Sequence, residues 1–377
     1  MRKSLLIAAM AGLAFVGCTE NDLDQSVSSQ SVIRFGSPVI SNQTKALGNP
    51  EDGEQKNKYS TAEHFSVYAV YHEGAYAGSS TAQVYFRNVD AGYNETAKCW
   101  DTASGQGGKD YYWPKKENAK LTFSAYSPTS TSGTIGWTEE SGFSLTDFTV
   151  EAQTKNQYDL MFSKRTMDKS TNTGGTSYVD PTDAVDINFE HALSSIVFTA
   201  GKDASYDGTT IKLKKITLQN VYSVGDYAQG LKDDASNSYQ DGYPKWAGQE
   251  TETEYVVFNN ATGIEITNTS APFHNAIDNA VILLPQAFDH TATSKKVTVK
   301  IDYSIQTSSG EEIEQTNYVN FVTGNGGDYF TDGTNKIQGW EIGKKYTYNI
   351  IFSFDKIYFS PEVADWTPVT VKGDVKF

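Results

Sequence analysis

The chain of 377 residues carries 31 Lys and Arg against 46 Asp and Glu, which gives a formal net charge of −15 at pH 7. This balance argues against nucleic acid and anionic membrane surfaces as partners, because both repel an acidic protein. The 23 Tyr, 19 Phe and 31 Gly, together with many Thr and Val, are typical of an all-β protein.

The first 18 residues predict a lipoprotein signal peptide. Arg2 and Lys3 form a basic start, residues 5–16 are almost entirely apolar, and Gly17 precedes Cys18. The apolar run is shorter than the roughly 20 residues that a permanent membrane span needs. We therefore expect export and lipidation of Cys18, since several acyl chains on one cysteine make a lasting anchor. Ordinary signal cleavage nearby, with Cys18 left unmodified, is the alternative.

Residues 19–58 predict a detachable strand followed by a polar linker. Residues 31–40 are strand-like, with Ile33 and Phe35 on one side, and Lys45 precedes the polar run 48–58. An extended, unpacked loop of this kind is where proteases cut.

The body of the chain predicts many short strands separated by Gly, Ser, Asn and Asp turns, which indicates β-sandwiches. Residues 346–354 alternate Tyr346, Tyr348, Ile350, Phe352 and Phe354 with mostly polar residues. The strands expected in chain order are residues 65–71, 121–126, 195–200, 212–218, 297–305, 314–322 and 346–354, with a turn at 308–310 that makes 297–305 and 314–322 a hairpin.

The length suggests two domains. The polar stretch 168–183 gives way to the alternating residues 185–189, which predicts a boundary there. We therefore expect β-sandwich domains at 59–185 and 186–377. Only Cys99 remains after Cys18, so no intrachain disulfide is expected and hydrophobic cores must stabilise the mature fold. Cys99, beside Trp100, is expected to be a buried small hydrophobe rather than a reactive thiol.

Candidate chemistry is sparse, and no catalytic residue, metal site or cofactor is predicted. The five histidines, at positions 64, 72, 191, 274 and 290, lack metal-ligand spacing. Residues 324–328 and 332–335 hold oxygen ligands that would suit calcium, but plain turns explain them better. Trp137 and Trp246, flanked by polar or turn residues, are candidate surface platforms for sugars. A secreted hydrolase is the least favoured interpretation, because no carboxylate pair stands in a recognisable context.

Several pieces of the chain resemble the Bacteroides-type fimbrillins, the subunits of type V pili. Each piece is loose, but their order behind a lipobox is specific. They are residues 111–114 leading into 121–126, residues 189–194, residues 281–286, and residues 343–348 followed by Asp365 and Trp366.

The resemblance implies two transthyretin-like β-sandwich domains and assembly into a surface fibre. It also implies a route in which an outer-membrane lipoprotein precursor reaches the surface, a trypsin-like protease removes its N-terminal segment, and a strand of a neighbouring pilin subunit fills the gap. We expect cleavage after Lys45, with Arg34 as the alternative. A cut at Arg34, inside the strand pattern, would leave residues 35–40 attached.

The last residues predict a strand that can be donated. Val369, Val371, Val375 and Phe377 alternate with polar residues up to the end of the sequence. Such a strand can add to the sheet of another subunit through its backbone and offer apolar side chains to a groove there. The alternative is that residues 367–377 form the last strand of their own domain.

Two functions follow from these observations. The first is a non-enzymatic pilin of a cell-surface fimbria that serves adhesion to host or bacterial surfaces. The second is a permanently lipid-anchored surface lipoprotein that binds glycans.

Overall fold

The computed structural model describes most of the chain between residues 32 and 366. The described residues are 32–41, 59–73, 82–114, 119–163, 166–170, 184–203, 209–230, 232–233, 238–239, 242–267, 271–272, 280–288, 296–306, 309–323, 328–332, 335–353 and 356–366. Strands dominate these residues, and the one helix among them is a single 3₁₀ turn, η1 (Thr154–Asn156). No helix in the described part is long and apolar enough to cross a membrane. The prediction of an all-β fold is confirmed.

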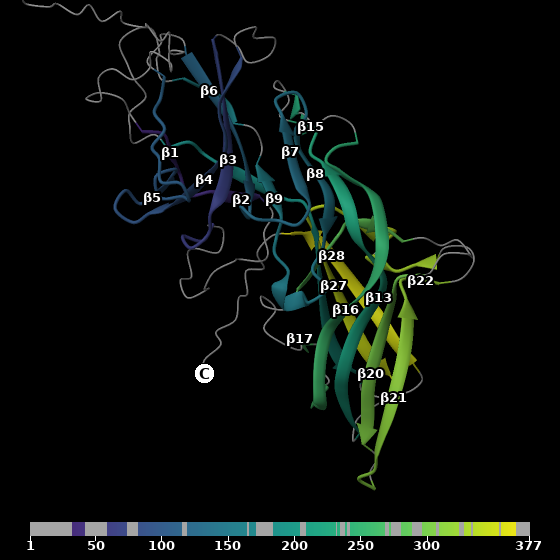
Figure 1. The fold of residues 1–377 in the computed structure, drawn as a ribbon. Coiled ribbons are helices and arrows are strands. Elements are labelled where there is room, and N and C mark those ends of the chain that lie inside the picture. Colours follow the sequence, from purple (N-terminus) through teal and green to yellow (C-terminus); the bar gives the residue numbers. More distant parts are fainter. Residues whose placement is uncertain are drawn as a thin grey trace, which may run out of the picture.

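The N-terminal half is built on a nine-stranded sheet, which lies at the upper left of Figure 1. The two ends of the sheet, β1 and β2, are neighbours in the sequence, so the stretch that contains them joins opposite edges of one sheet. The order is β1 (Arg34–Phe35), β5 (Cys99–Asp101), β4 (Gln83–Asn94), β3 (Phe65–Glu73), β6 (Ala119–Ser127), β9 (Met161–Ser163), β11 (Asn188–His191) and β2 (Val39–Ser41), with β10 (Thr166–Ser170) beside β6.

Two further sheets face each other in the C-terminal half. The first has the order β17 (Ala271–Pro272), β12 (Ser194–Lys202), β27 (Lys344–Ser353) and β28 (Lys356–Asp365), with β18 (Val281–Leu283) on β12. The second has the order β21 (Glu312–Asn320), β20 (Thr298–Gln306), β13 (Thr210–Ala228), β8 (Gly142–Thr149) and β7 (Thr134–Thr138), with β16 (Lys245–Glu265) on β13. Rings from the two sheets touch, with the centroids of Tyr303 and Phe352 5.0 Å apart. The two sheets therefore form a sandwich.

Four short strand pairs complete the described fold. They are β14 (Lys232–Asp233) with β15 (Ser238–Tyr239), β19 (Gln286–Ala287) with β26 (Gly339–Trp340), β22 (Val322–Thr323) with β23 (Asp328–Tyr329), and β24 (Thr331–Asp332) with β25 (Asn335–Lys336).

The buried apolar side chains form two clusters, one in each half. The N-terminal core contains Ile33, Phe35, Phe65, Phe123 and Phe189 among others. The C-terminal core is larger and fills the sandwich, but it also takes in side chains from before the predicted boundary, namely Tyr68, Tyr126, Phe143, Leu145, Phe148, Val150, Leu160 and Phe162. The hairpin of β7 and β8 pairs with β13. Backbone pairing thus crosses the boundary expected near residue 185, and the division into 59–185 and 186–377 stays a prediction.

The strands expected from alternation are present. In β27 the side chains of Tyr346, Tyr348, Ile350 and Phe352 are all buried, while Phe354 lies outside the described residues. β20 and β21 form the expected hairpin, paired in unbroken register from Thr298 with Asn320 to Gln306 with Glu312. The expected strand 212–218 is the first part of the much longer β13.

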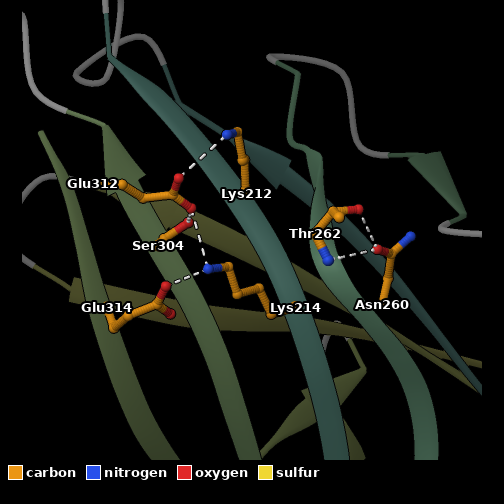
Figure 2. A network of polar contacts seen from close by, with 7 residues as sticks. All are labelled: Lys212, Lys214, Asn260, Thr262, Ser304, Glu312 and Glu314. Atoms are coloured by element: carbon orange, nitrogen blue, oxygen red, sulfur yellow. Dashed lines mark hydrogen bonds and ion pairs between the residues drawn. The ribbon is translucent and has the colours of Figure 1, made fainter. Parts of the chain in front are cut away.

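Charged side chains form a ladder of ion pairs on the outer face of β13, β20 and β21 (Figure 2). Lys212 and Lys214 reach across β20 to Glu312, at 3.4 and 3.1 Å, and Lys214 also binds Glu314. The Ser304 hydroxyl donates to Glu312 at 2.5 Å. This hydrogen bond, reinforced by Lys214, lowers the pKa of Glu312 to about 2. Charged side chains at a sheet edge also discourage pairing with foreign strands.

Candidate functional site

The N-terminal segment, defined here as residues 32–41, closes the nine-stranded sheet. Its first half pairs antiparallel with one edge, where Arg34 lies opposite Asp101 and Phe35 opposite Trp100. The amide of Ile33 donates to the carbonyl oxygen of Tyr111 at 2.8 Å. The segment therefore continues the sheet beyond β5.

The other side of the same segment pairs in parallel with residues 185–190. The amide of Val185 donates to the Arg34 carbonyl at 2.7 Å, and the amides of Gly36 and Val39 donate to the carbonyls of Val185 and Ile187 at 3.0 and 2.9 Å. β2 then pairs in parallel register with β11. We call the two edges that receive the segment, β5 with residues 111–112 and residues 185–190, the acceptor edges.

The side chains of the segment alternate between the core and the surface. Ile33 and Phe35 are fully buried, whereas Val39 is 50% exposed. The Phe35 ring meets Phe65 and Phe123 edge to face, at centroid distances of 5.5 and 5.7 Å. Burying a large apolar side chain contributes about 1.5–3 kcal/mol, so Ile33 and Phe35 together stabilise the closed arrangement by roughly 3–6 kcal/mol before ordering costs.

Tyr59 lies next to the segment, where its backbone amide donates to the carbonyl oxygen of Pro38 at 3.4 Å. The Tyr59 hydroxyl lies 2.6 Å from the Ser127 hydroxyl and donates to the carbonyl of His64 at 2.6 Å. Burial raises the pKa of Tyr59 well above its ordinary value, so the phenol keeps its proton. The ring packs against Phe65, Trp100 and Phe189. Both ends of the linker 42–58 are therefore fixed to the same core.

The structure separates the two expected cleavage sites. Arg34 lies in β1, between the buried Ile33 and Phe35, and its carbonyl accepts a backbone hydrogen bond. Lys45 lies outside the described residues, as do Cys18 and the expected donor strand with Val369, Val371, Val375 and Phe377. In the described part the last strand is β28, and Trp366 follows it.

The two tryptophans suggested as sugar platforms are packed against the core. Trp137 lies 5.0 Å from Tyr68 between ring centroids, and Arg87 covers it at 5.6 Å. Trp246 packs against Phe148 and Tyr227, and its indole N–H donates to the carbonyl of Ala192 at 2.6 Å. Both rings are only partly buried, so the interpretation of these residues as surface platforms for sugars stays a prediction.

Cys99 and the described part of the oxygen-rich turns occupy ordinary structural positions. Cys99 is buried, and desolvation raises the pKa of its thiol, as expected for a small hydrophobe. Asp332 and Asn335 pair in the tight turn of β24 and β25. Residues 324–327 lie outside the described part.

The three histidines in the described part of the chain do not converge on a metal site. His64 Nδ1 lies 2.8 Å from Asp90 Oδ1, His191 Nδ1 lies 2.7 Å from Asp159 Oδ2, and His72 is buried in β3. His274 and His290 lie outside the described residues. Within the described part, no group of three or more His, Cys, Asp or Glu side chains is arranged to hold a metal ion.

Sequence reasoning missed the acceptor edges. In the sequence, the alternation of Val185, Ile187 and Phe189 predicts only a domain boundary. In the structure, these three side chains are buried in the same core as Ile33 and Phe35. Parallel pairing with a segment about 150 residues earlier leaves no local signature. The signal that was available is the matching alternation of the two short stretches.

Three solved structures are similar to this chain, and the first of them shows a shared fold. A fimbrial protein from Bacteroides vulgatus is 15% identical, with a TM-score of 0.52 over 89% of this chain and 100% of that protein. A candidate cell adhesion protein from Bacteroides uniformis is 16% identical, with a TM-score of 0.47 over 91% and 100% of the two chains. A tip fimbrial protein from Porphyromonas gingivalis is 12% identical, with a TM-score of 0.36 over 88% and 99%.

A search of curated proteins found no match. The comparison with protein families found one match, which runs from the linker before Tyr59 to Trp366 and so covers both halves of the described structure. Over residues 54–366 the sequence matches the fimbrillin-like family, and the chain belongs to that family.

Proposed function

We propose that the protein is a non-enzymatic structural subunit of a cell-surface fimbria that serves adhesion, and that removal of its N-terminal segment opens it to a strand of another subunit. The observation that carries the proposal is the position of residues 32–41 as a separate closing strand, paired on both sides, with Ile33 and Phe35 fully buried. Membership of the fimbrillin-like family and the fold shared with a fimbrial protein support the same role.

Processing after Lys45 fits this arrangement better than processing at Arg34. Proteases act on extended backbone that is free of other pairing. The Arg34 carbonyl is engaged by Val185, and the following residue, Phe35, is buried. A cut after Lys45 would detach the whole segment, whereas a cut after Arg34 would leave β2 bound to β11.

The strand that replaces the segment is proposed to be residues 369–377 of another subunit. Val369, Val371, Val375 and Phe377 alternate with polar residues, as Ile33 and Phe35 alternate with more exposed neighbours. Strand addition satisfies the backbone groups of both acceptor edges and refills the core. Pairing of residues 367–377 with their own sheet before assembly is compatible with this role.

Lipidation at Cys18 is proposed to anchor the precursor in the outer membrane until it is processed. Cys18 and Lys45 both precede the body of the protein, so one cut after Lys45 would remove the lipid and the closing strand together. The lipid would then be a temporary tether.

The test is limited trypsin treatment of the unlipidated chain from Thr19 to Phe377. We expect one early cut after Lys45, release of the N-terminal segment and a ladder of oligomers on a native gel. Because trypsin can also cut after Lys56 and Lys58 in the same linker, the variants are made in a chain with both of these changed to Ala. In that chain Lys45→Ala should block the cut and the ladder, while the matched variant Arg34→Ala should leave both in place. Deletion of residues 369–377 should leave the cut but abolish the ladder. Cleavage and release without any oligomer in the intact chain would overturn the proposal.

A further inference from the structure

β11 lies between β2 of the N-terminal segment and β9. One edge of β11 pairs antiparallel with β9, where His191 lies opposite Met161. The other edge pairs in parallel with β2 over residues 188–190. His191, the last residue of β11, therefore directly follows the residues that hold the N-terminal segment.

The side chain of His191 forms a buried stack with Trp366. The two rings are almost parallel, with an interplanar angle of 7° and centroids 3.9 Å apart. On the other side, His191 Nδ1 lies 2.7 Å from Asp159 Oδ2, and both of these side chains are 1% exposed. We call these three residues the Asp159–His191–Trp366 cluster.

Trp366 is also fixed through its backbone. Its amide donates to the carbonyl of Gly343 at 2.9 Å, and the amide of Gly343 donates in turn to the carbonyl of Leu193, two residues after His191, at 2.9 Å. Trp366 thus contacts the last residue of β11 through its ring, and its backbone is linked through Gly343 to Leu193, just beyond β11. Trp366 immediately precedes residues 367–377, which contain the expected donor strand.

The cluster holds buried polar atoms that are not satisfied. Among the described residues, no hydrogen-bond partner is found for His191 Nε2, Asp159 Oδ1 or Trp366 Nε1. Buried polar atoms without a partner are costly and persist only where the surrounding packing enforces them. We therefore expect the packing of the cluster to loosen when β11, which carries His191, loses a neighbouring strand.

We propose that β11 couples the N-terminal segment to Trp366, the residue before 367–377, so that loss of the segment loosens the Asp159–His191–Trp366 cluster. The coupling rests on the proposed function for its purpose, but it is a property of the single subunit. On the proposed function it would order the two events of assembly, because a subunit whose acceptor edges are still closed keeps its Trp366 fixed.

Hydrogen exchange on the full unlipidated chain, measured residue by residue by NMR, tests the coupling in monomers. Phe35→Ala weakens the segment in place. The control variant Phe86→Ala removes a phenyl ring from the same core on β4, a strand that does not pair with the segment. The amides read are those of Val39, which reports the segment, and Trp366, which reports the cluster. The amide of Ile266, bonded to Ile211 at 2.8 Å, serves as a distant reference.

We expect Phe35→Ala to accelerate exchange at both Val39 and Trp366 by at least tenfold, with Ile266 unchanged. Phe86→Ala should not accelerate Trp366 selectively. Coupling between two sites is reciprocal, so His191→Gln, which removes the stacked ring, should accelerate Val39 as well as Trp366. Should Phe35→Ala fail to fold, Phe35→Leu replaces it with the same expected order of effects.

An unchanged Trp366 rate in a variant whose Val39 exchanges faster would overturn the coupling. So would equal acceleration of Trp366 and Ile266, since that pattern reports global unfolding. Neither result depends on polymer formation, so the coupling can fail while the proposed function stands. Conversely, coupling found in a chain that never forms oligomers would contradict only the proposed function.

Discussion

The burial of Phe35 gives a quantitative prediction for release of the N-terminal segment. In a chain cut between Ser41 and Tyr59, only non-covalent contacts keep the segment in place. Phe35 is fully buried and meets two other phenyl rings edge to face. Replacing such a residue by Ala costs about 3–5 kcal/mol. Because each 1.4 kcal/mol is a factor of ten, Phe35→Ala should weaken retention of the segment roughly 100-fold to a few thousand-fold.

The assay uses a specific protease site inserted within residues 42–58, so that it does not depend on which natural bond is cut. After cleavage, the fraction of chains that still hold the segment is followed by gel filtration and mass spectrometry. Val39→Ala is the matched control, because Val39 lies on the same segment but is 50% exposed. We expect this control to behave within about threefold of the parent, in line with the small effects of most surface substitutions.

Equal retention by the two variants would refute the reasoning. It would mean that the backbone pairing with the acceptor edges, and not the buried side chains, holds the segment. Near-ultraviolet circular dichroism of both variants before cleavage serves as the control for folding.

Three further predictions concern other parts of the fold. The folded-state pKa of Glu312 is lowered to about 2 by the hydrogen bond from Ser304 and by Lys214. Its contribution to stability is therefore present above about pH 4.5 and lost as the pH falls toward 2, so the melting temperatures of the parent and Glu312→Gln should converge over this range. Trp246→Phe keeps an aromatic ring but removes the indole N–H and its hydrogen bond to a backbone carbonyl, and urea unfolding should show a loss of about 1–3 kcal/mol. Gly343 has a φ of +67°, so Gly343→Ala should cost about 1–2 kcal/mol in the same assay.

Alternation predicted strands well wherever burial repeats every two residues within one strand. β27 is the clearest case, since its four alternating apolar side chains all lie in the core. The hairpin of β20 and β21 was equally accessible, because a short polar turn fixes its register locally. Such features need no knowledge of distant residues.

The full length of β13 was not predictable in the same way. Its pairing with β16 shifts register at four places, and Asn220 in its middle has a φ of +59°. Each bulge inserts an extra residue and reverses the faces that follow, so the alternation breaks although the strand continues. The sequence pattern therefore ends at residue 218, ten residues before the strand does.

The candidate site was predictable on one side only. Ile33 and Phe35 were expected to share a face of a strand, and both are buried. Their acceptor at residues 185–190 joins them in parallel across about 150 residues of sequence, and no local pattern specifies such a pairing. The stack of His191 on Trp366 joins two family-like pieces 175 residues apart, which the sequence marked individually but did not bring together.

The energetics of the segment explain why cleavage can open a fold that is otherwise stable. While the segment is joined to the body, its return to the acceptor edges is an intramolecular event at an effective concentration in the millimolar range. Burial of its two large side chains, Ile33 and Phe35, then adds to the backbone pairing that keeps the sheet closed. Once cut, the segment loses that advantage. The proposed donor strand offers four large apolar side chains in place of two, worth roughly 6–12 kcal/mol against 3–6 before ordering costs. On the proposed route, this difference would give strand exchange its direction, because the segment would close the precursor only as long as it remains covalently attached.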